Sequence, residues 1–308
     1  MVTVLSNSDV HRLVFMREAV EAVEEALLRR GAGEFLTPPR HYVANRKGAL
    51  TFTIGGDAAE GVFGFRVYGM FPGSHEDDQL VVVYDAATGE LRGIVQGERI
   101  GAMRTGALGG VAIRHAARED ANTVAVIGSG RQARTQLEAA AVVRRLSEVR
   151  VYSRSTARRE AFASEMSDRL TLRISPVTTP AAAIAGADIV IVATDSRTPV
   201  FYPSLIQPGQ HVTTIRLGQG QHELDAGVAD RADAIFTDSL EQLRSYPGGF
   251  FLADRIGTIT DLSEHVALGK PVRQSPEEIT LYLSTGLSGT EVIVADIALR
   301  KMNGSTAE

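Results

Sequence analysis

The spacing of apolar residues changes character along the chain. From Val10 to Leu27 they recur every three or four positions, which predicts an amphipathic helix over residues 8–30. Ser8 or Asp9 would cap the start of this helix, and Gly31 would end it. Apolar runs separated by turn residues then predict strands over residues 51–54, 62–70, 79–85 and 91–96. The first third of the chain is therefore expected to form a mainly antiparallel sheet with a flanking helix.

After Asp120, strand and helix patterns alternate. Strands with continuous apolar character are predicted over residues 123–128, 149–153, 170–174, 187–194, 211–218 and 232–238. Such strands, alternating with helices, are typical of a parallel, doubly wound sheet that is covered on both faces. A further strand-like run at 279–284 precedes an amphipathic helix within residues 284–301.

The change of pattern predicts an α/β protein of two domains, for which 308 residues are enough. Residues 119–287 are expected to form a Rossmann-type domain with a doubly wound parallel sheet. Residues 1–118 and 288–308 are expected to form a mainly antiparallel α+β domain. The stretch from Glu98 to about Arg118 is predicted to be a helix of small residues.

Composition excludes several classes of function. Lys and Arg total 32 against 37 Asp and Glu, a net charge of −5, which argues against a nucleic-acid-binding surface. The absence of cysteine excludes disulfides and thiolate sites, and the seven histidines lack the spacing of a zinc site. Neither a signal peptide nor a membrane-spanning run is recognisable, so we expect a soluble, cytoplasmic protein.

A glycine-rich turn follows the first strand of the alternating region. The segment VAVIGSGRQA places Gly128, Gly130 and Ala133 in a G-x-G-x-x-A pattern between a strand and a helix. Gly128 would permit the tight turn, Gly130 would let the backbone approach a pyrophosphate, and Ala133 would let the helix pack on the strand. A tight turn that binds nothing is the alternative. The context favours a dinucleotide-binding loop.

The end of the next strand indicates which dinucleotide is bound. An NAD site usually carries an acidic residue there, which binds the ribose 2′-hydroxyl. This chain instead reads SRSTARR, with Ser153, Arg154 and Ser155 at that position and Arg158 or Arg159 nearby. Arginines suit a 2′-phosphate, so NADP is favoured over NAD, unless these side chains are simply solvated. The segment ATDSRTP, residues 193–199, follows the fourth strand, where the nicotinamide is expected.

Several motifs together resemble those of the ornithine cyclodeaminase/mu-crystallin family over essentially the whole chain. They are PPR at 38–40, GFR at 64–66, AMRT at 102–105, GSGRQA at 128–133, ATDSRTPV at 193–200, ELD at 223–225 and STGL at 284–287. The resemblance implies a Rossmann domain joined to a substrate-binding and dimerisation domain, and hence a homodimer. It also implies a small α-amino or α-imino acid as substrate, with Arg40 and Arg104 binding its carboxylate and Thr105 next to the cofactor.

Arg104 lies in AMRTGALGG, where small neighbours would let a substrate and the nicotinamide approach closely. The alternative for a desolvated guanidinium is an ion pair with a carboxylate of the protein itself. With the resemblance included, the candidate cofactor-binding residues are Thr105, Gly128, Ser129, Gly130, Arg131, Gln132, Ser153, Arg154, Ser155, Arg158, Ala193, Thr194, Ser196 and Leu217.

Two departures from the family pattern bear on the chemistry. Family cyclodeaminases have a lysine where this chain has Arg66, which stays protonated and is a poor acid or base. Their catalytic aspartate would fall at about Leu217 or Gly218, where no acid is present. Residues 40–56 also lack a carboxylate that could hold the distal ammonium of ornithine. Ornithine cyclodeamination is therefore disfavoured.

Hydride transfer needs fewer groups than cyclodeamination, because the cofactor supplies the chemistry. We therefore expect an NAD(P)H-dependent oxidoreductase that reduces an imine or ketimine of an α-keto acid, or runs the reverse dehydrogenation. Arg40, Arg66 and Arg104 would bind the substrate, with Arg66 as the candidate catalytic residue and no metal. A cyclodeaminase and a non-catalytic, crystallin-like cofactor-binding protein remain alternatives. The proton donor is not identified, since His41, Tyr42, Tyr68 and His75 fit packing or surface positions as well.

Overall fold

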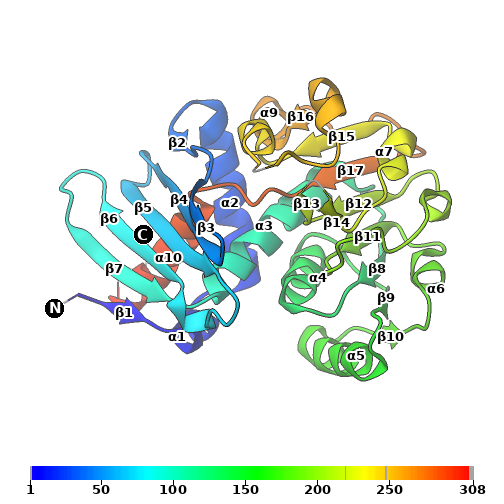
Figure 1. Ribbon diagram of the computed structural model, residues 1–308, viewed down its shortest axis with the longest axis horizontal. Helices are drawn as coiled ribbons and strands as arrows, with labels where there is room; N and C mark the ends of the chain where they lie inside the picture. The colour runs from blue at the N-terminus through cyan, green and yellow to red at the C-terminus, as the bar shows by residue number, and fades with distance from the viewer. Residues whose placement is uncertain (1, 219, 247, 305–308) are drawn as a thin grey trace. The chain divides into compact units, whose positions relative to one another are not determined.

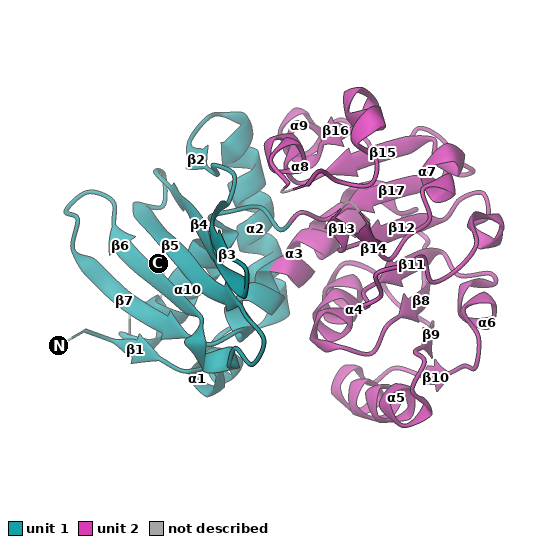
Figure 2. Ribbon diagram, in the orientation of Figure 1, with its two compact units in different colours: residues 1–104, 286–308 teal, residues 105–285 magenta. Residues whose placement is uncertain are grey.

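The computed structural model describes residues 2–218, 220–246 and 248–304, and the chain divides into two compact units. Unit 1 comprises residues 1–104 and 286–308, and unit 2 comprises residues 105–285 (Figure 2). The first boundary falls inside helix α3 (Arg99–Ala116), earlier than the expected position after Arg118. One unit contains an antiparallel sheet and the other a parallel sheet, so the predicted α/β fold class is confirmed.

Unit 1 is built on a seven-stranded sheet (Figure 1). Its order is β1-β7-β6-β5-β4-β2, with β3 also paired to β4, and every pair except β1–β7 is antiparallel. The strands are β1 (Val4–Leu5), β2 (Phe35–Leu36), β3 (His41–Asn45), β4 (Gly48–Asp57), β5 (Val62–Met70), β6 (Leu80–Asp85) and β7 (Leu91–Gln96). The sequence patterns identified only the four longest of these, because β1, β2 and β3 carry too few alternating apolar residues to stand out.

The single helix predicted over residues 8–30 is in fact two helices, α1 (Asn7–Leu13) and α2 (Met16–Gly31). Ser6, not Ser8 or Asp9, caps α1, since its side chain accepts the Asp9 N–H. The backbone is extended at Phe15, whose N–H is accepted by the Glu18 carboxylate at 3.0 Å. A second capping site therefore interrupts a helical periodicity that continues across the break.

Helix α10 (Thr290–Met302) packs on one face of the sheet, against β4 to β7. On the opposite face, the register of β3, β4 and β5 brings Val43, Leu50, Ile54 and Phe63 to the same side. All four of these apolar side chains are exposed. The sheet thus buries one face under α10 and leaves apolar side chains uncovered on the other.

Unit 2 contains an eight-stranded, entirely parallel sheet in the order β10-β9-β8-β11-β12-β17-β15-β16, which confirms the predicted Rossmann-type fold (Figure 1). Its strands are β8 (Thr123–Ile127), β9 (Glu148–Tyr152), β10 (Ile174–Pro176), β11 (Ile189–Val192), β12 (His211–Thr214), β15 (Ala234–Thr237), β16 (Thr260–Asp261) and β17 (Thr280–Leu283). The α-helices that connect them are α4 (Arg131–Val143), α5 (Thr156–Leu170), α6 (Pro180–Ile184), α7 (Gly227–Arg231), α8 (Leu240–Arg244) and α9 (Leu262–Leu268). Short 3-10 turns occur at Glu76–Asp78, Pro203–Leu205 and Ala253–Thr258.

Several predicted strands of this region are shorter than expected, among them those over 187–194 and 232–238, which are observed as β11 and β15. The strand predicted over 170–174 begins only at Ile174, because α5 continues to Leu170 and ends at Thr171 in the left-handed conformation. The strand predicted over 211–218 ends at Thr214. Beyond it, a separate ladder pairs β13 (Leu217–Gly218) with β14 (Gln221–His222).

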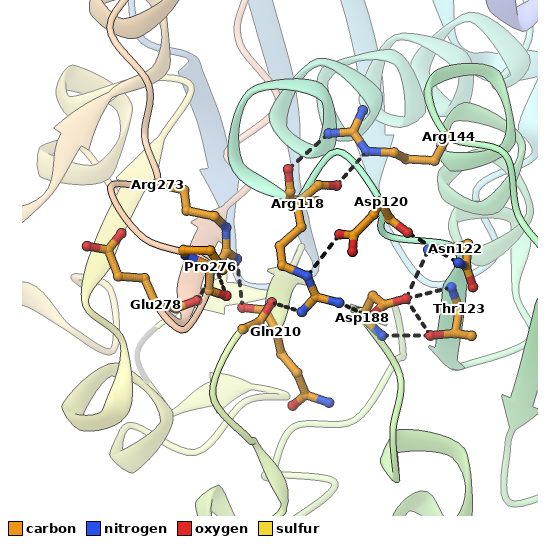
Figure 3. Close-up of polar contacts among 12 residues, drawn as sticks. Arg118, Asp120, Asn122, Thr123, Arg144, Asp188, Gln210, Arg273, Pro276 and Glu278 are labelled. Atoms are coloured by element: carbon orange, nitrogen blue, oxygen red, sulfur yellow. Dashed lines mark hydrogen bonds and ion pairs between the residues drawn. The ribbon is translucent and has the colours of Figure 1, made fainter.

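An ionic network holds the amino-terminal edge of the parallel sheet (Figure 3). The Asp188 carboxylate accepts the backbone N–H groups of Asn122 and Thr123, both at 2.9 Å, and it pairs with the Arg118 guanidinium. Arg144 donates to the carbonyl oxygen of Ile113 in α3 and to those of Ala117 and Arg118 just after the helix. These contacts fix the amino ends of the strands. In open α/β sheets, ligands bind at the opposite, carboxyl ends.

Candidate active site

A cavity of about 680 Å³ opens at the carboxyl ends of β8, β9 and β11, and its size suits a small-molecule ligand. The residues that line it are Ile127, Gly128, Ser129, Gly130, Arg131, Gln132, Tyr152, Ser153, Arg154, Ser155, Arg158, Ala193, Thr194, Asp195, Ser196, Val200 and Ile215. All the predicted cofactor-binding residues except Thr105 and Leu217 are among them. Sequence reasoning therefore located this cavity and most of its wall.

The glycine loop at one side of the cavity has the backbone that the motif requires. Gly128 has a φ of +124°, and a Cβ at this position would lie 2.0 Å from the Ala193 carbonyl oxygen. A Cβ at Gly130, the residue before α4, would meet no atom within 4 Å. Arg134 Nη1 donates to the Ser129 carbonyl oxygen at 2.6 Å and so braces the loop. The loop thus leaves open space at a helix N-terminus, which is a favourable position for a phosphate.

The segment after β9 forms a second side of the cavity. Ser153, Arg154 and Arg158 line it, and Ser155 caps α5 by accepting the Arg158 N–H. Arg159 does not line the cavity; it donates to the Ser153 carbonyl oxygen at 3.1 Å and supports the turn. Among the described lining residues, the one acid is Asp195, which follows β11 and not β9. The position that would hold an acid in an NAD site therefore carries serine and arginine.

Thr194 and Ile215 form a third side of the cavity, and Glu223 lies behind it. Glu223 belongs to the ELD motif, but the sequence alone predicted no function for it. It is fully buried and accepts hydrogen bonds from Thr194, Thr214 and Ile215. Burial raises the pKa of its carboxyl to about 7, and the hydrogen bonds oppose that effect. The buried Glu223 carboxylate thus joins the carboxyl ends of β11 and β12 through the hydrogen bonds that it accepts.

Two predicted cofactor residues lie elsewhere. The Leu217 side chain is 1% exposed and belongs to the hydrophobic core of unit 2. The Thr105 carbonyl oxygen accepts from Gln136 Nε2 of α4 at 2.9 Å, so this residue contributes to helix packing. Neither of the two lines the cavity.

The three predicted substrate-binding arginines come together in unit 1. Arg66 on β5 and Arg104 on α3 are both more than nine-tenths buried, and Arg40 Nη2 donates to the Gly286 carbonyl oxygen at 2.5 Å. A Cβ at Gly286 would lie 2.2 Å from Arg104 Nη1 and 2.8 Å from Arg40 Nη2. Gly286 therefore leaves the room that both guanidinium groups occupy.

Sequence reasoning missed Glu291, in the first turn of α10, as the partner of these arginines. Its Oε1 lies 3.3 Å from Arg104 Nη2 and 3.8 Å from Arg66 Nη1, and it accepts a hydrogen bond from Thr53. The alternative that Arg104 pairs with a carboxylate of the protein is therefore realised in part. The available signal was an acid in the mostly apolar segment TEVIVADIAL, which also contains Asp296.

One carboxylate does not satisfy this cluster. Burial and, next, the charge of Arg104 lower the pKa of Arg66 to about 10, although Glu291 acts in the opposite direction. Arg104 Nε and Nη1 are buried and donate to no described residue. The cluster is thus short of negative charge, which favours the binding of an anion.

The small residues around Arg104 let parts of the protein pack closely on one another, one of the two uses expected of such a run. A Cβ at Gly101 would lie 2.3 Å from Arg66 Nη2, so this glycine makes room for that guanidinium. Gly106 and Gly109 lie against Thr135 and Gln136 of α4 at similarly short range. These three glycines contact the protein itself, and the approach of a substrate and the nicotinamide to this run stays a prediction.

The other candidates take structural positions. Tyr68 lies under the Arg66 guanidinium, with 4.3 Å between Arg66 Cζ and the ring centroid, and the His75 N–H is accepted by Asp78. His41 is exposed on β3. Within the described ranges, no cluster of His, Asp and Glu could hold a metal ion, and none of the helices there is both long and apolar enough to cross a membrane.

Comparison with known proteins agrees with this architecture. The ornithine cyclodeaminase/mu-crystallin family profile matches residues 1–305. A Δ1-pyrroline-2-carboxylate reductase of Bacillus cereus is 30% identical over 312 residues, 97% of this chain and 96% of the relative.

Two solved structures are similar over nearly their whole length. One is Thermococcus litoralis Δ1-pyrroline-2-carboxylate reductase in complex with NADH and L-proline, with a TM-score of 0.90, 31% identity and coverage of 99% of this chain and 98% of that one. The other is an archaeal alanine dehydrogenase dimer with bound NAD, with a TM-score of 0.87, 29% identity and coverage of 100% and 98%. The family predicted from the motifs is confirmed: the chain belongs to the ornithine cyclodeaminase/mu-crystallin family.

Proposed function

We propose that this protein is an NAD(P)H-dependent oxidoreductase that reduces an imine or ketimine of an α-keto acid, or catalyses the reverse dehydrogenation of an amino acid. The predicted oxidoreductase class is confirmed by its relatives, which are named as reductases and dehydrogenases. Their named substrates, Δ1-pyrroline-2-carboxylate and alanine, both carry a carboxylate on the carbon that bears the nitrogen. A substrate of this chemistry is proposed here too.

The observation that carries the proposal is the charge imbalance around Arg104. Two buried guanidinium groups share Glu291, and Arg104 retains donors that no described residue accepts. A substrate carboxylate would supply the missing negative charge and would fix the position of the neighbouring α-carbon. Arg66 remains protonated near neutral pH, so its role is to bind and orient rather than to transfer a proton.

The residues of unit 2 fit a dinucleotide. The loop Gly128–Gln132 would hold the pyrophosphate, and Ser153, Arg154 and Arg158 would hold the ribose next to the adenine. When bound, the nicotinamide would supply or accept the hydride. The arginines at the ribose side support NADP as the preferred form, because a 2′-phosphate requires positive charge where an NAD site has a carboxylate.

We further propose that the protein forms a homodimer through the exposed apolar face of the unit 1 sheet. Val43, Leu50, Ile54 and Phe63 make this face apolar, and an exposed face of that kind marks an interaction surface. A second copy is the simplest partner, since one similar structure is a dimer.

Turnover of the reduced cofactor tests the reaction. NADPH and NADH oxidation is followed with pyruvate plus ammonia or methylamine, with Δ1-pyrroline-2-carboxylate, and with mixtures that form iminosuccinate. We expect oxidation with at least one of these imines. If none reacts while ornithine yields proline and ammonia with catalytic cofactor, the protein is a cyclodeaminase. Cofactor binding without either activity identifies a non-catalytic binding protein.

A further inference from the structure

Glu223 is a fully buried acid that no cation neutralises within the described part of the chain. Its Oε2 accepts from the Thr194 N–H at 2.5 Å and from Thr194 Oγ1 at 2.8 Å. Its Oε1 accepts from Thr214 Oγ1 and from the Ile215 N–H, each at 3.1 Å. All of these donors are neutral groups, and no ion pair joins Glu223 to another side chain in the described ranges.

Two of the three donor residues, Thr194 and Ile215, belong to the wall of the cavity. Thr194 follows β11 and Ile215 follows β12, two strands that are neighbours in the parallel sheet, and both residues line the cavity. Glu223 does not line it. The carboxylate therefore lies directly behind the wall and joins the two strand ends.

This wall is the one that a nicotinamide ring would meet. The glycine loop takes the pyrophosphate and the segment after β9 takes the adenosine ribose, so the remaining end of the cavity is left for the nicotinamide half. The inference rests on the proposed use of a nicotinamide cofactor. It does not depend on which imine is the substrate.

We propose that the Glu223 carboxylate makes this site prefer the oxidised cofactor and acts as a positioning residue for Thr194 and Ile215. When hydride leaves the reduced nicotinamide with its electron pair, the ring changes from neutral to a charge of +1. The iminium carbon accepts that hydride, and the substrate nitrogen loses its positive charge. A fixed negative charge behind the ring stabilises the cationic form, because the surrounding protein screens it less than water does.

The charged state of Glu223 fits this role. Its oxygens accept hydrogen bonds from two backbone N–H groups. A backbone N–H can only donate, so it could not accept a hydrogen bond from a protonated Glu223 carboxyl. Burial raises the pKa of the carboxyl to about 7, so it is ionised in mildly alkaline solution. The charged or titratable neighbours in the contacting segments are Asp195, Arg216, His222 and Asp225; of these, His222 stacks on Phe251.

Binding measurements on the substrate-free protein test the proposal. Dissociation constants for NADP⁺ and NADPH are measured by calorimetry and nucleotide fluorescence at about pH 8.5. We expect E223Q to weaken binding of the oxidised form about three- to tenfold more than binding of the reduced form. T214V removes one neutral donor and keeps the charge, so it should change both constants in parallel. H222Q should leave their ratio unchanged.

The wild-type protein provides an independent measurement if E223Q does not fold. Its preference for the oxidised form should fall between about pH 8.5 and about pH 5.5, and H222Q should show the same fall. A ratio that is unchanged in E223Q, or that does not vary with pH in the wild type, overturns the inference alone. If neither cofactor form binds, the proposed function fails together with it.

Discussion

At the scale of single residues, the site depends on charges that are only partly compensated. Arg104 and Arg66 share one carboxylate, and Glu223 has hydrogen-bond donors but no cation among the described residues. Such groups lower the stability of the unliganded protein, and a bound ligand of opposite charge would offset that cost. The sequence indicated the arginines, because their motifs are local. It showed Glu291 only as an acid in a mostly apolar segment, and not as the partner of Arg104, because their ion pair joins positions far apart in the chain.

The arginines at the ribose side of the cavity should determine cofactor preference. The double variant R154A/R158A is expected to lower kcat/KM for NADPH about 10- to 100-fold and to change that for NADH little, since only NADPH carries the 2′-phosphate. Initial rates with both cofactors measure the effect. R145A, which removes an exposed arginine that does not line the cavity, is the matched control. Equal losses with both cofactors would contradict the NADP assignment.

The raised pKa of Glu223 should appear in the pH dependence of stability. The folded state keeps this proton up to about pH 7, whereas the unfolded carboxyl loses it near 4.5, so the stability contributed by Glu223 falls as pH rises through this interval. His211 acts in the opposite direction, since burial lowers its pKa from 6.5 to about 3 and its contribution grows with rising pH.

The comparison with E223Q separates the two effects. Between about pH 5 and pH 8, the unfolding free energy of the wild type should fall by about 2.5 kcal/mol relative to that of E223Q. Urea unfolding at several pH values measures the difference. Parallel curves for the two proteins would show that Glu223 is ionised throughout this range.

At the scale of elements, periodicity and glycine spacing predicted a helix or strand well where its position depends mainly on its own residues. The strand–glycine loop–helix unit from β8 to α4 and the final helix α10 were located from periodicity and glycine spacing. The break between α1 and α2 was missed because the apolar periodicity continues through Phe15. Leu217 was misplaced because the short β13–β14 ladder turns its side chain into the core. The small residues of α3 were recognised, but their packing partners lie on other elements.

The connection from β17 to α10 provides an element-scale prediction. In G286A, the new Cβ would overlap the Arg104 guanidinium, and a φ of +71° disfavours any side chain. We expect KM for the imino acid to rise at least about tenfold while the dissociation constant of NADPH is unchanged. G269A is the matched control, because Gly269 also has a positive φ but a Cβ there meets no atom within 4 Å. Equal effects of the two substitutions on KM would argue for backbone strain alone.

At the scale of the whole molecule, the exposed sheet face should determine assembly. Ile54 is 45% exposed on that face, and I54D would place a charge in the proposed interface. Sedimentation velocity is expected to show dimers for the wild type and monomers for I54D at micromolar concentration.

Met70 offers a control of similar exposure. It is 50% exposed, but it pairs with Ala49, so its side chain points to the other face of the sheet. M70D should therefore remain dimeric. A wild-type protein that sediments as a monomer would refute the proposed interface.

Because unit 1 is formed by two separate segments of the chain, the two units can complete their folding at different times during synthesis on the ribosome. Unit 2 is continuous and precedes α10 in the chain, whereas unit 1 needs α10 to cover its sheet. Until α10 emerges, the nascent N-terminal segment exposes both sheet faces and lacks Glu291 beside its arginines. Contacts between such distant segments form slowly, and we expect this incomplete state to be prone to aggregation. Truncation from the C-terminus is therefore more damaging than the small number of residues removed would suggest.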